Sequence, residues 1–358
     1  MRVAYTLEQC WHRVPGGTAV AALEVARHLR DSGDVELIGV AGRHRTAPTK
    51  GFEPPIPLMR LPVGSPWLYQ TWLRASWPKV ESVVDGAALV HSTTIIPPAT
   101  SLPLVATIHD LAFLHHPEFF TRNGNKVFRR SLEILRERGS LLLCSSRATM
   151  DHCVEAGFRP ESLRLVPLGV DRRDITDAAR ERVRATYDLP REFVLFVGTL
   201  EPRKNLERLV KAMAEVKNAP PLVVAGMQGW GDIEPPTHRD VRTIGYVPHS
   251  LLPALYEAST VFAMPSVLEG YGLPVAEAMA HGTAVVTSRG TSTEEVAGGA
   301  AVLVDPLDVA SIARGIEEAM SRRTELVALG SARADSLSWE ETARLTAAAY
   351  RELAGMTP

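Results

Sequence analysis

Short apolar runs alternate with amphipathic segments along the first half of the chain. Runs of four to six residues rich in Val, Ile and Leu predict buried strands, and apolar residues at helical spacing over 18–31 predict a helix. The predicted strands are 2–6, 35–40, 88–91, 104–108 and 141–145. This alternation is typical of a parallel sheet with helices on both faces.

The alternation begins again after residue 171, with predicted strands at 194–197, 222–225, 241–244, 261–264, 284–287 and 301–304. Two such series predict an α/β protein of two Rossmann-like domains, whose parallel sheets face a central cleft that holds the ligand. We expect an N-terminal domain over 1–172 and a C-terminal domain over 173–336. In the last segment, 337–358, the helical pattern at 339–353 should pack back on the N-terminal domain.

Composition supports two soluble domains and excludes some partners. The chain has 358 residues, of which 45% are hydrophobic and 22% charged. Its net charge of -2 argues against a dedicated nucleic-acid binder, which is usually basic. We find no signal peptide and no long apolar span, so we expect a cytoplasmic protein. Cys10, Cys144 and Cys153 fit no metal or redox spacing and are interpreted as reduced thiols.

The segment 265–277 carries the most specific chemistry. Glu269 and Glu277 stand eight positions apart, on either side of a glycine-rich turn and a helix start marked by Pro274. Glycines allow close backbone approach to a ligand, and the amides of a helix start bind anions. We therefore expect a phosphate between the two acids. The turn between them consists of Gly270, Tyr271, Gly272 and Leu273.

A second turn, at 198–205, follows the first predicted strand of the C-terminal domain. It presents Arg203 and Lys204 side by side, and two cations can neutralise a departing diphosphate. Asn205 is a candidate cap for the helix that follows. The alternative is a solvated basic turn that binds no ligand. The acidic segment, which we expect opposite this turn, makes that alternative weaker.

A further feature, in the N-terminal domain, is a weaker signal. Gly16 and Gly17 follow the first strand and lead into a helix, where the backbone can approach a phosphate. There is no G-x-G-x-x-G and no acid closing the second strand, so a nicotinamide or flavin enzyme is disfavoured.

His109 ends the predicted strand 104–108 at the cleft edge. It could hydrogen-bond a sugar hydroxyl or stand beside a reacting centre, and a structural capping role is the alternative. His115 and His116 follow, but their spacing from His109 and Asp110 does not match zinc, so we expect no metal site.

Taken together, these motifs resemble the retaining glycosyltransferases of family 4, which have the GT-B fold. The resemblance covers nearly the whole chain, and the Thr-Leu-Glu-Pro-Arg-Lys-Asn and His-Asp-Leu forms are most similar to the mannosyltransferase-like branch. It implies that Glu277 binds the ribose hydroxyls, that Glu269 faces the donor sugar, and that Arg203 and Lys204 hold the diphosphate. His109 then matches the donor-side histidine. The other nucleotide-sugar-binding residues that it implies are Gly16, Gly17, Gly270, Tyr271, Gly272 and Leu273, and Val247, before Pro248, is a candidate to flank the base.

The implied activity is a retaining, metal-independent transfer of a hexose, with mannose favoured, from a nucleotide-diphosphate sugar. The acceptor would be a hydroxyl of a glycan, a lipid-linked sugar or a small molecule, as in polysaccharide biosynthesis, and no cofactor beyond the donor is implied. A nucleotide-sugar 2-epimerase shares the two-domain plan and is the main alternative. A non-catalytic nucleotide-sugar-binding protein is the third.

Two further features have more than one interpretation. Trp67, Trp72 and Trp77 lie within eleven residues and could rest at the inner face of the cell membrane, or they could pack in the core or line the cleft. A basic helical face could contact anionic lipid or an acceptor phosphate, or it could simply be solvated. Its residues are Lys126, Arg129, Arg130, Arg136 and Arg138.

Overall fold

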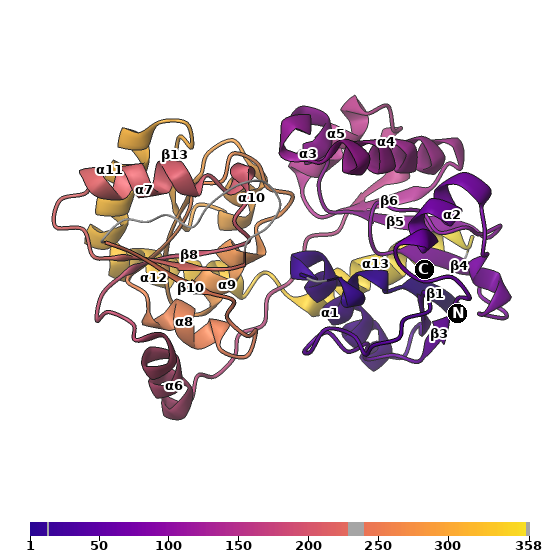
Figure 1. Cartoon of the computed structure of the whole chain (residues 1–358), viewed down its shortest axis with the longest axis horizontal. Coiled ribbons are helices and arrows are strands. Elements are labelled where there is room, and N and C mark those ends of the chain that lie inside the picture. Colours follow the sequence, from indigo (N-terminus) through magenta and orange to yellow (C-terminus); the bar gives the residue numbers. More distant parts are fainter. Residues whose placement is uncertain (13, 228–239, 356–358) are drawn as a thin grey trace. The chain divides into compact units, whose positions relative to one another are not determined.

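The computed structural model describes residues 1–12, 14–227 and 240–355. The chain divides into two compact units: Met1–Gly169 together with the segment that begins at Trp339, and Val170–Ser338 (Figure 1). Within the described residues, no helix is both long and apolar enough to cross a membrane.

The first unit contains a parallel sheet with the order β3-β2-β1-β4-β5-β6-β7. Its strands are β1 (Arg2–Thr6), β2 (Glu36–Ala41), β3 (Leu58–Arg60), β4 (Leu89–Ser92), β5 (Leu104–Ile108), β6 (Leu141–Cys144) and β7 (Leu163–Leu165).

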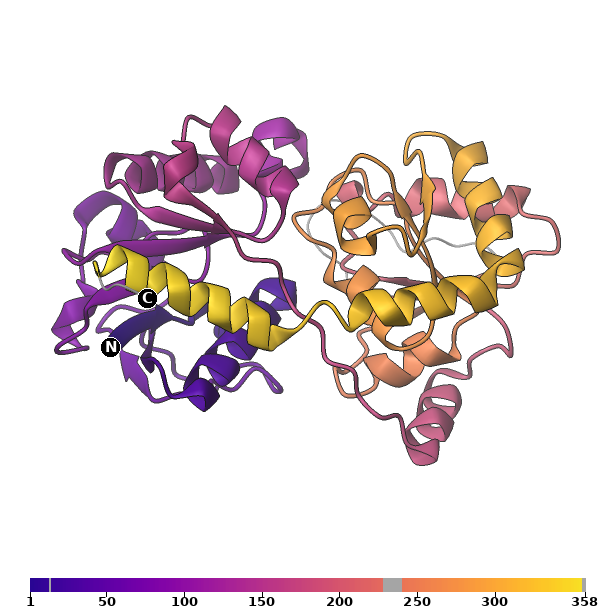
Figure 2. The ribbon, with the colours of Figure 1, turned by 180° about the vertical axis from the view of Figure 1, so that it is seen from behind.

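Helices cover both faces of this sheet. On one face, α1 (Gly16–Ser32) packs beside α13 (Trp339–Leu353), although their sequences are far apart (Figure 2). On the other face, side chains of α2 (Trp67–Ala75), α4 (Arg122–Glu137) and α5 (Arg147–Glu155) share one apolar core with the sheet. The short helix α3 (Ala112–His115) follows β5.

The second unit contains a parallel sheet with the order β10-β9-β8-β11-β12-β13. Its strands are β8 (Val194–Val197), β9 (Leu222–Ala225), β10 (Val241–Gly245), β11 (Val261–Met264), β12 (Ala284–Ser288) and β13 (Val302–Val304). Helices α7 (Leu206–Glu215) and α11 (Val309–Ser321) lie together on one face (Figure 1). The remaining helices are α6 (Asp177–Tyr187), α8 (Leu252–Ala258), α9 (Leu273–Ala280), α10 (Ser292–Ala297) and α12 (Arg323–Ala334).

The predicted α/β class with two parallel sheets is confirmed. Strands such as β6 and β8 are almost wholly apolar because helices cover the sheet on both sides, which is why apolar runs located them. The predictions missed β3 and β7, which are three-residue strands at the edges of the first sheet. An edge strand pairs on one side only and needs no long apolar run, so it leaves little pattern in the sequence.

The tryptophan-rich segment serves partly as core. Trp72 is buried, and its indole Nε1 donates to the carbonyl of Pro78 at 3.1 Å. Trp67 and Trp77 are exposed, at 67% and 52%. Membrane contact therefore stays a prediction, and among these three residues it depends on Trp67 and Trp77.

The predicted basic face of α4 is largely engaged in local contacts. Arg130 pairs with Glu133 at 3.0 Å, and Arg136 donates to the carbonyl of Ala156. Arg138, just beyond the helix, donates to the carbonyl of Leu102 at 2.9 Å. These contacts favour the solvated or structural interpretation of the basic residues.

A buried histidine ties α13 to the first sheet. His91 lies 2.5 Å by Nδ1 from the hydroxyl of Tyr350, and 2.8 Å by Nε2 from that of Thr107. Burial lowers the pKa of His91 to about 3, with a smaller contribution from the charge of His109. The folded chain therefore keeps this imidazole neutral across the neutral and mildly acidic range.

We expect this histidine to make the protein sensitive to acid. The unfolded chain binds a proton near pH 6.5 and the folded chain does not, so the contribution to stability is complete above pH 6.5 and falls as the pH drops toward 3. At pH 5 the loss should be about 2 kcal/mol. Urea unfolding at pH 7 and pH 5 should show that His91→Gln loses less stability than the wild type over this interval. An equal loss in both proteins would contradict the assignment.

Candidate functional site

The candidate site in the second unit lies at the switch point of its sheet. The chain runs from β8 outward to β9 and β10, and then returns to β11 on the other side of β8. The loops after β8 and β11 therefore leave the same edge in opposite directions, and ligands of open α/β sheets bind at such a point. These loops carry Arg203, Lys204 and Glu269, which is why residues 66 and 65 positions apart meet.

Two cations converge on one buried carboxylate. Arg203 Nη1 lies 2.8 Å from Glu269 Oε2, and Lys204 Nζ lies 2.6 Å from Glu269 Oε1. All three side chains are largely shielded from water, with exposures of 15%, 8% and 7%. These two cations are the groups that an anionic ligand would contact, although the carboxylates of Glu269 and of Glu201 balance their charge in the ligand-free chain.

The ion pairs keep Glu269 ionised despite its burial. Burial alone would raise the pKa of this carboxyl group, but the nearby charges of Arg203 and Lys204 outweigh it and lower the pKa to about 2. The carboxylate therefore cannot serve as a general acid near neutral pH. It can accept hydrogen bonds and offset positive charge.

Glu201 is a member of this group that the sequence analysis did not select. Its buried carboxylate accepts from Arg203 Nε at 2.9 Å and from the hydroxyl of Thr199 at 2.5 Å. Arg203 is thus held from two sides, by Glu201 and by Glu269. Its position two residues before Arg203 was the available signal, but only the folded turn shows that the carboxylate is directed back at the guanidinium.

The predicted role of Asn205 as a helix cap is wrong. Asn205 directly precedes α7, but its side chain accepts from the Arg208 side chain at 2.9 Å and makes no capping bond to a backbone amide, and its backbone is left-handed, with φ of 62°. The amide nitrogen Nδ2 instead donates to the carbonyls of Pro265 and Pro306 at 2.8 and 2.6 Å. Asn205 therefore fastens the basic turn to the loop that follows β11.

The glycine turn leads into α9 as expected, but the position of the proline within the helix differs by one residue from the prediction. Helix α9 begins at Leu273, and Pro274 occupies the second helical position, not the first. Gly272 precedes it with φ of 103°, and a Cβ there would lie 2.7 Å from Thr293 Cγ2. Both the backbone angle and this contact require glycine. Leu273 contributes an N–H of the helix's first turn, the kind of group that binds anions.

The other residues of the second unit that are predicted to bind the nucleotide sugar lie on this turn, on α9 and after β10. Glu277 is on α9, and its Oε2 accepts a hydrogen bond from the buried hydroxyl of Tyr256 on α8 at 2.8 Å. Tyr271 is buried, which raises the pKa of its hydroxyl. Gly270 directly follows Glu269, and the backbone carbonyl of Glu269 accepts from Ser292. Val247 is buried in the loop after β10, the edge strand of this sheet.

The remaining predicted residues belong to the first unit. Gly16 and Gly17 lie in the first turn of α1, and Gly16 has φ of 65°. His109 directly follows β5, and its Nε2 lies 3.3 Å from the carbonyl of Thr93. Burial lowers the pKa of His109, partly opposed by the charge of Asp110. The imidazole is therefore suited to hydrogen bonding as a neutral group.

A polar group that the sequence analysis missed lies at the switch point of the first sheet. Buried Glu8 follows β1; one of its carboxylate oxygens accepts from the amide of Gly42 at 2.7 Å, and the other lies 3.0 Å from His44 Nε2. The ring of His44 stacks on Trp11 with centroids 4.6 Å apart, and Arg60 lies over the same indole. Carboxylate, imidazole and indole groups together are suited to binding a polyhydroxyl compound. Only the sheet order brings these groups together.

Comparison with known proteins places the chain in a family. Two family models match consecutive parts: Glycosyltransferase Family 4 over residues 15–174 and Glycosyl transferases group 1 over residues 178–334. The first ends and the second begins near the division between the two units.

Relatives from Escherichia coli are mannosyltransferases. The O-antigen chain mannosyltransferase B is 33% identical over 276 residues, which cover 70% of this chain and 70% of that protein. The serotype-specific mannosyltransferase WbdA is 29% identical over 73% of this chain, but the match covers only 35% of WbdA. The chain thus spans about a third of that larger relative.

Among solved structures, the complex of Anabaena Alr3699/HepE with UDP and glucose matches with a TM-score of 0.75. The match covers 98% of this chain and 100% of that one at 18% identity, so it shows the fold alone. The chain therefore belongs to glycosyltransferase family 4, in its mannosyltransferase-like branch, and has the GT-B fold.

Proposed function

We propose that this glycosyltransferase moves a hexose, with mannose favoured, from a nucleotide-diphosphate sugar to an acceptor hydroxyl, with retention of the anomeric configuration. The observation that carries the proposal is the buried group of Arg203, Lys204 and Glu269 at the switch point of the second sheet. Two cations beside a glycine turn and a helix start suit a diphosphate that must leave with its charge neutralised.

The donor would occupy the second unit. Its diphosphate would take up the charges of Arg203 and Lys204 and the amides at the start of α9, while Glu277 on the same helix would accept from the ribose hydroxyls. Glu269 would then be free to orient the sugar. The mannosyltransferase relatives support mannose as the sugar.

The retaining mechanism is a further part of the proposal. In this proposal Glu269 meets the donor sugar and orients it, and in the ligand-free chain its ion pairs with Arg203 and Lys204 lower its pKa. The acceptor hydroxyl would attack from the face that the diphosphate leaves, and a phosphate oxygen would take its proton. Arg203 and Lys204 would stabilise the leaving group, which removes the need for a metal ion.

The acceptor would bind the first unit. The group around Glu8, His44 and Trp11 offers polar and aromatic contacts suited to a sugar, which supports a glycan or lipid-linked acceptor. A role in polysaccharide assembly agrees with the O-antigen relative, and a cytoplasmic location is part of the same proposal. Contact with the inner face of the membrane through Trp67 and Trp77 is part of the same proposal.

The test is transfer by the purified chain after a thermal-shift screen has found the nucleotide sugar that binds. Nuclear magnetic resonance of the product should show the anomeric configuration of the donor, and excess EDTA should leave the rate unchanged, because protein cations neutralise the diphosphate. An inverted product would reject the retaining mechanism. Activity lost with EDTA and restored by Mg²⁺ would reject metal independence.

Incubation of the donor without an acceptor separates the alternatives. We expect neither epimerised sugar nor rapid donor consumption. Formation of the 2-epimer would favour an isomerase, and binding without transfer to any acceptor would favour a non-catalytic role.

A further inference from the structure

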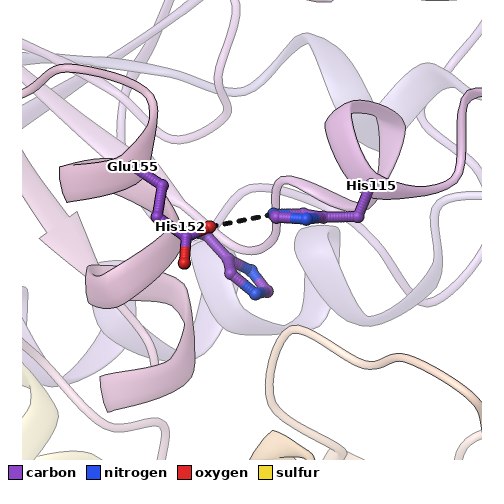
Figure 3. A group of neighbouring side chains, drawn as sticks. All are labelled: His115, His152 and Glu155. Carbon is purple, nitrogen blue, oxygen red and sulfur yellow. Dashed lines mark ion pairs between the residues drawn. The ribbon is translucent and has the colours of Figure 1, made fainter.

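Two histidines and a glutamate that have no role in the proposals above converge on the surface of the first unit. His115 comes from α3, whereas His152 and Glu155 come from α5 (Figure 3). His152 and Glu155 are three positions apart, so a helix presents them on one face. Among the described residues, this is the one group of three or more His, Cys, Asp or Glu side chains whose ligand atoms lie within 4.8 Å of one another.

We propose that His115, His152 and Glu155 bind one Zn²⁺ ion, which ties α3 to α5. His115 Nε2 lies 3.7 Å from Glu155 Oε2, and the two imidazole rings have centroids 4.0 Å apart. Ligand atoms on one tetrahedral zinc lie about 3.4 Å apart, because each is about 2.1 Å from the ion. The exposed ends of these side chains can close the remaining distance by rotation, and water would complete the coordination.

The local charges favour a cation here. The ring of His152 is half-buried beside the ring of His115. The carboxylates of Asp110, Asp151 and Glu155 act on the same ring with negative charge. Two imidazoles and one carboxylate select zinc and similar transition metals over Mg²⁺, which prefers oxygen ligands.

A bound ion would stiffen the turn that presents His109. The carbonyl of His109 accepts from Ser145 and Thr149, which lie at the start of α5, and Asp110 accepts from the first amide of α3. The turn is thus fastened to α5 on one side and to α3 on the other. A zinc ion bound by residues of α3 and α5 would add a direct link between the two helices that hold the turn.

The sequence alone did not predict this site. The spacing of His109, Asp110, His115 and His116 does not match zinc, so no metal site was expected. His152 lies on α5, which α4 and β6 separate from α3 in the sequence, and only the packing of α3 near α5 brings it to His115. The proposed ion lies within the first unit and takes no part in neutralising the diphosphate.

The test is a Zn²⁺ titration of the whole chain, without a histidine tag, in competition with a chromophoric chelator. The wild type should bind one ion, and His152→Ala should weaken binding by at least about 100-fold, because loss of a supporting residue alone costs about 10 to 100-fold. His116→Ala is the matched control, since His116 pairs with Glu118 at 3.1 Å outside the group. It should bind zinc as the wild type does.

Hydrogen exchange supplies a second measurement. Zinc should slow exchange at 110–116 in the wild type and in His116→Ala but not in His152→Ala, and Mg²⁺ should have no effect. Melting curves without zinc would establish that all three proteins fold. Equal zinc affinity in the wild type and His152→Ala would overturn the proposal and would direct attention to the buried thiols of Cys144 and Cys153.

Discussion

Replacing Lys204 by alanine should lower turnover about 100-fold or more, which is the loss typical of a group that stabilises charge on a leaving oxygen. The ammonium is buried and lies 2.6 Å from Glu269 in the folded chain. Without it, Arg203 alone would face both the carboxylate and the departing diphosphate. The rate constant for transfer at saturating donor is the measurement to make.

Lys211→Ala is the matched control for this substitution. Lys211 belongs to the same unit and also pairs with a glutamate at 2.6 Å, but its side chain is 60% exposed. Its loss should leave turnover unchanged, because exposed pairs contribute little. Lys204→Met retains most of the side-chain volume and should be as slow as Lys204→Ala. A near-normal rate in a folded Lys204 variant would remove this residue from the mechanism.

Glu269→Gln should slow transfer by about 100 to 1,000-fold and at the same time tighten the binding of the free nucleoside diphosphate. In the ligand-free chain, the carboxylate occupies both cations that the diphosphate needs. An amide of the same shape competes less, so the diphosphate binds more tightly. The amide also lacks the negative charge that would orient and stabilise the sugar in the transition state.

Calorimetric titration with the nucleoside diphosphate, combined with turnover measurements, tests both effects. Glu207→Gln is the control, because Glu207 is exposed in the same unit and should change neither quantity. Weaker diphosphate binding together with slow transfer would mean that Glu269 supports the site structurally, since its carboxylate is the partner that Arg203 and Lys204 share. The free energy of unfolding of each variant distinguishes these cases.

Local patterns located most of the elements of this fold. The predicted strands 2–6, 104–108, 194–197, 222–225 and 261–264 have the bounds of β1, β5, β8, β9 and β11. Covered parallel strands are continuous apolar runs, so each element can be recognised without its neighbours. The three-residue strands β3 and β7 are at the edges of the sheet, where this constraint is weak.

Only part of the candidate site could be predicted from the sequence. The basic turn and the acidic segment carry distinctive residue types at fixed spacing, and the loops that contain them follow adjacent strands. The contribution of Glu201 and the clamp formed by Asn205 were not predictable, because both depend on which way a side chain turns within its loop. The same is true of Glu8, whose partner His44 follows a neighbouring strand.

The sequence by itself determined the alternation of strands and helices, the α/β class and the family, since these depend on residue types at short spacing. The tertiary structure decided which charges share a site. The sequence predicted Glu269 as a ligand of the sugar, but only the order of β8 and β11 places it within 2.8 Å of Arg203 and 2.6 Å of Lys204 and so keeps it ionised. The meeting of His115 with His152 likewise depends on helix packing, because contacts between distant segments follow from sheet order and packing, which no local pattern encodes.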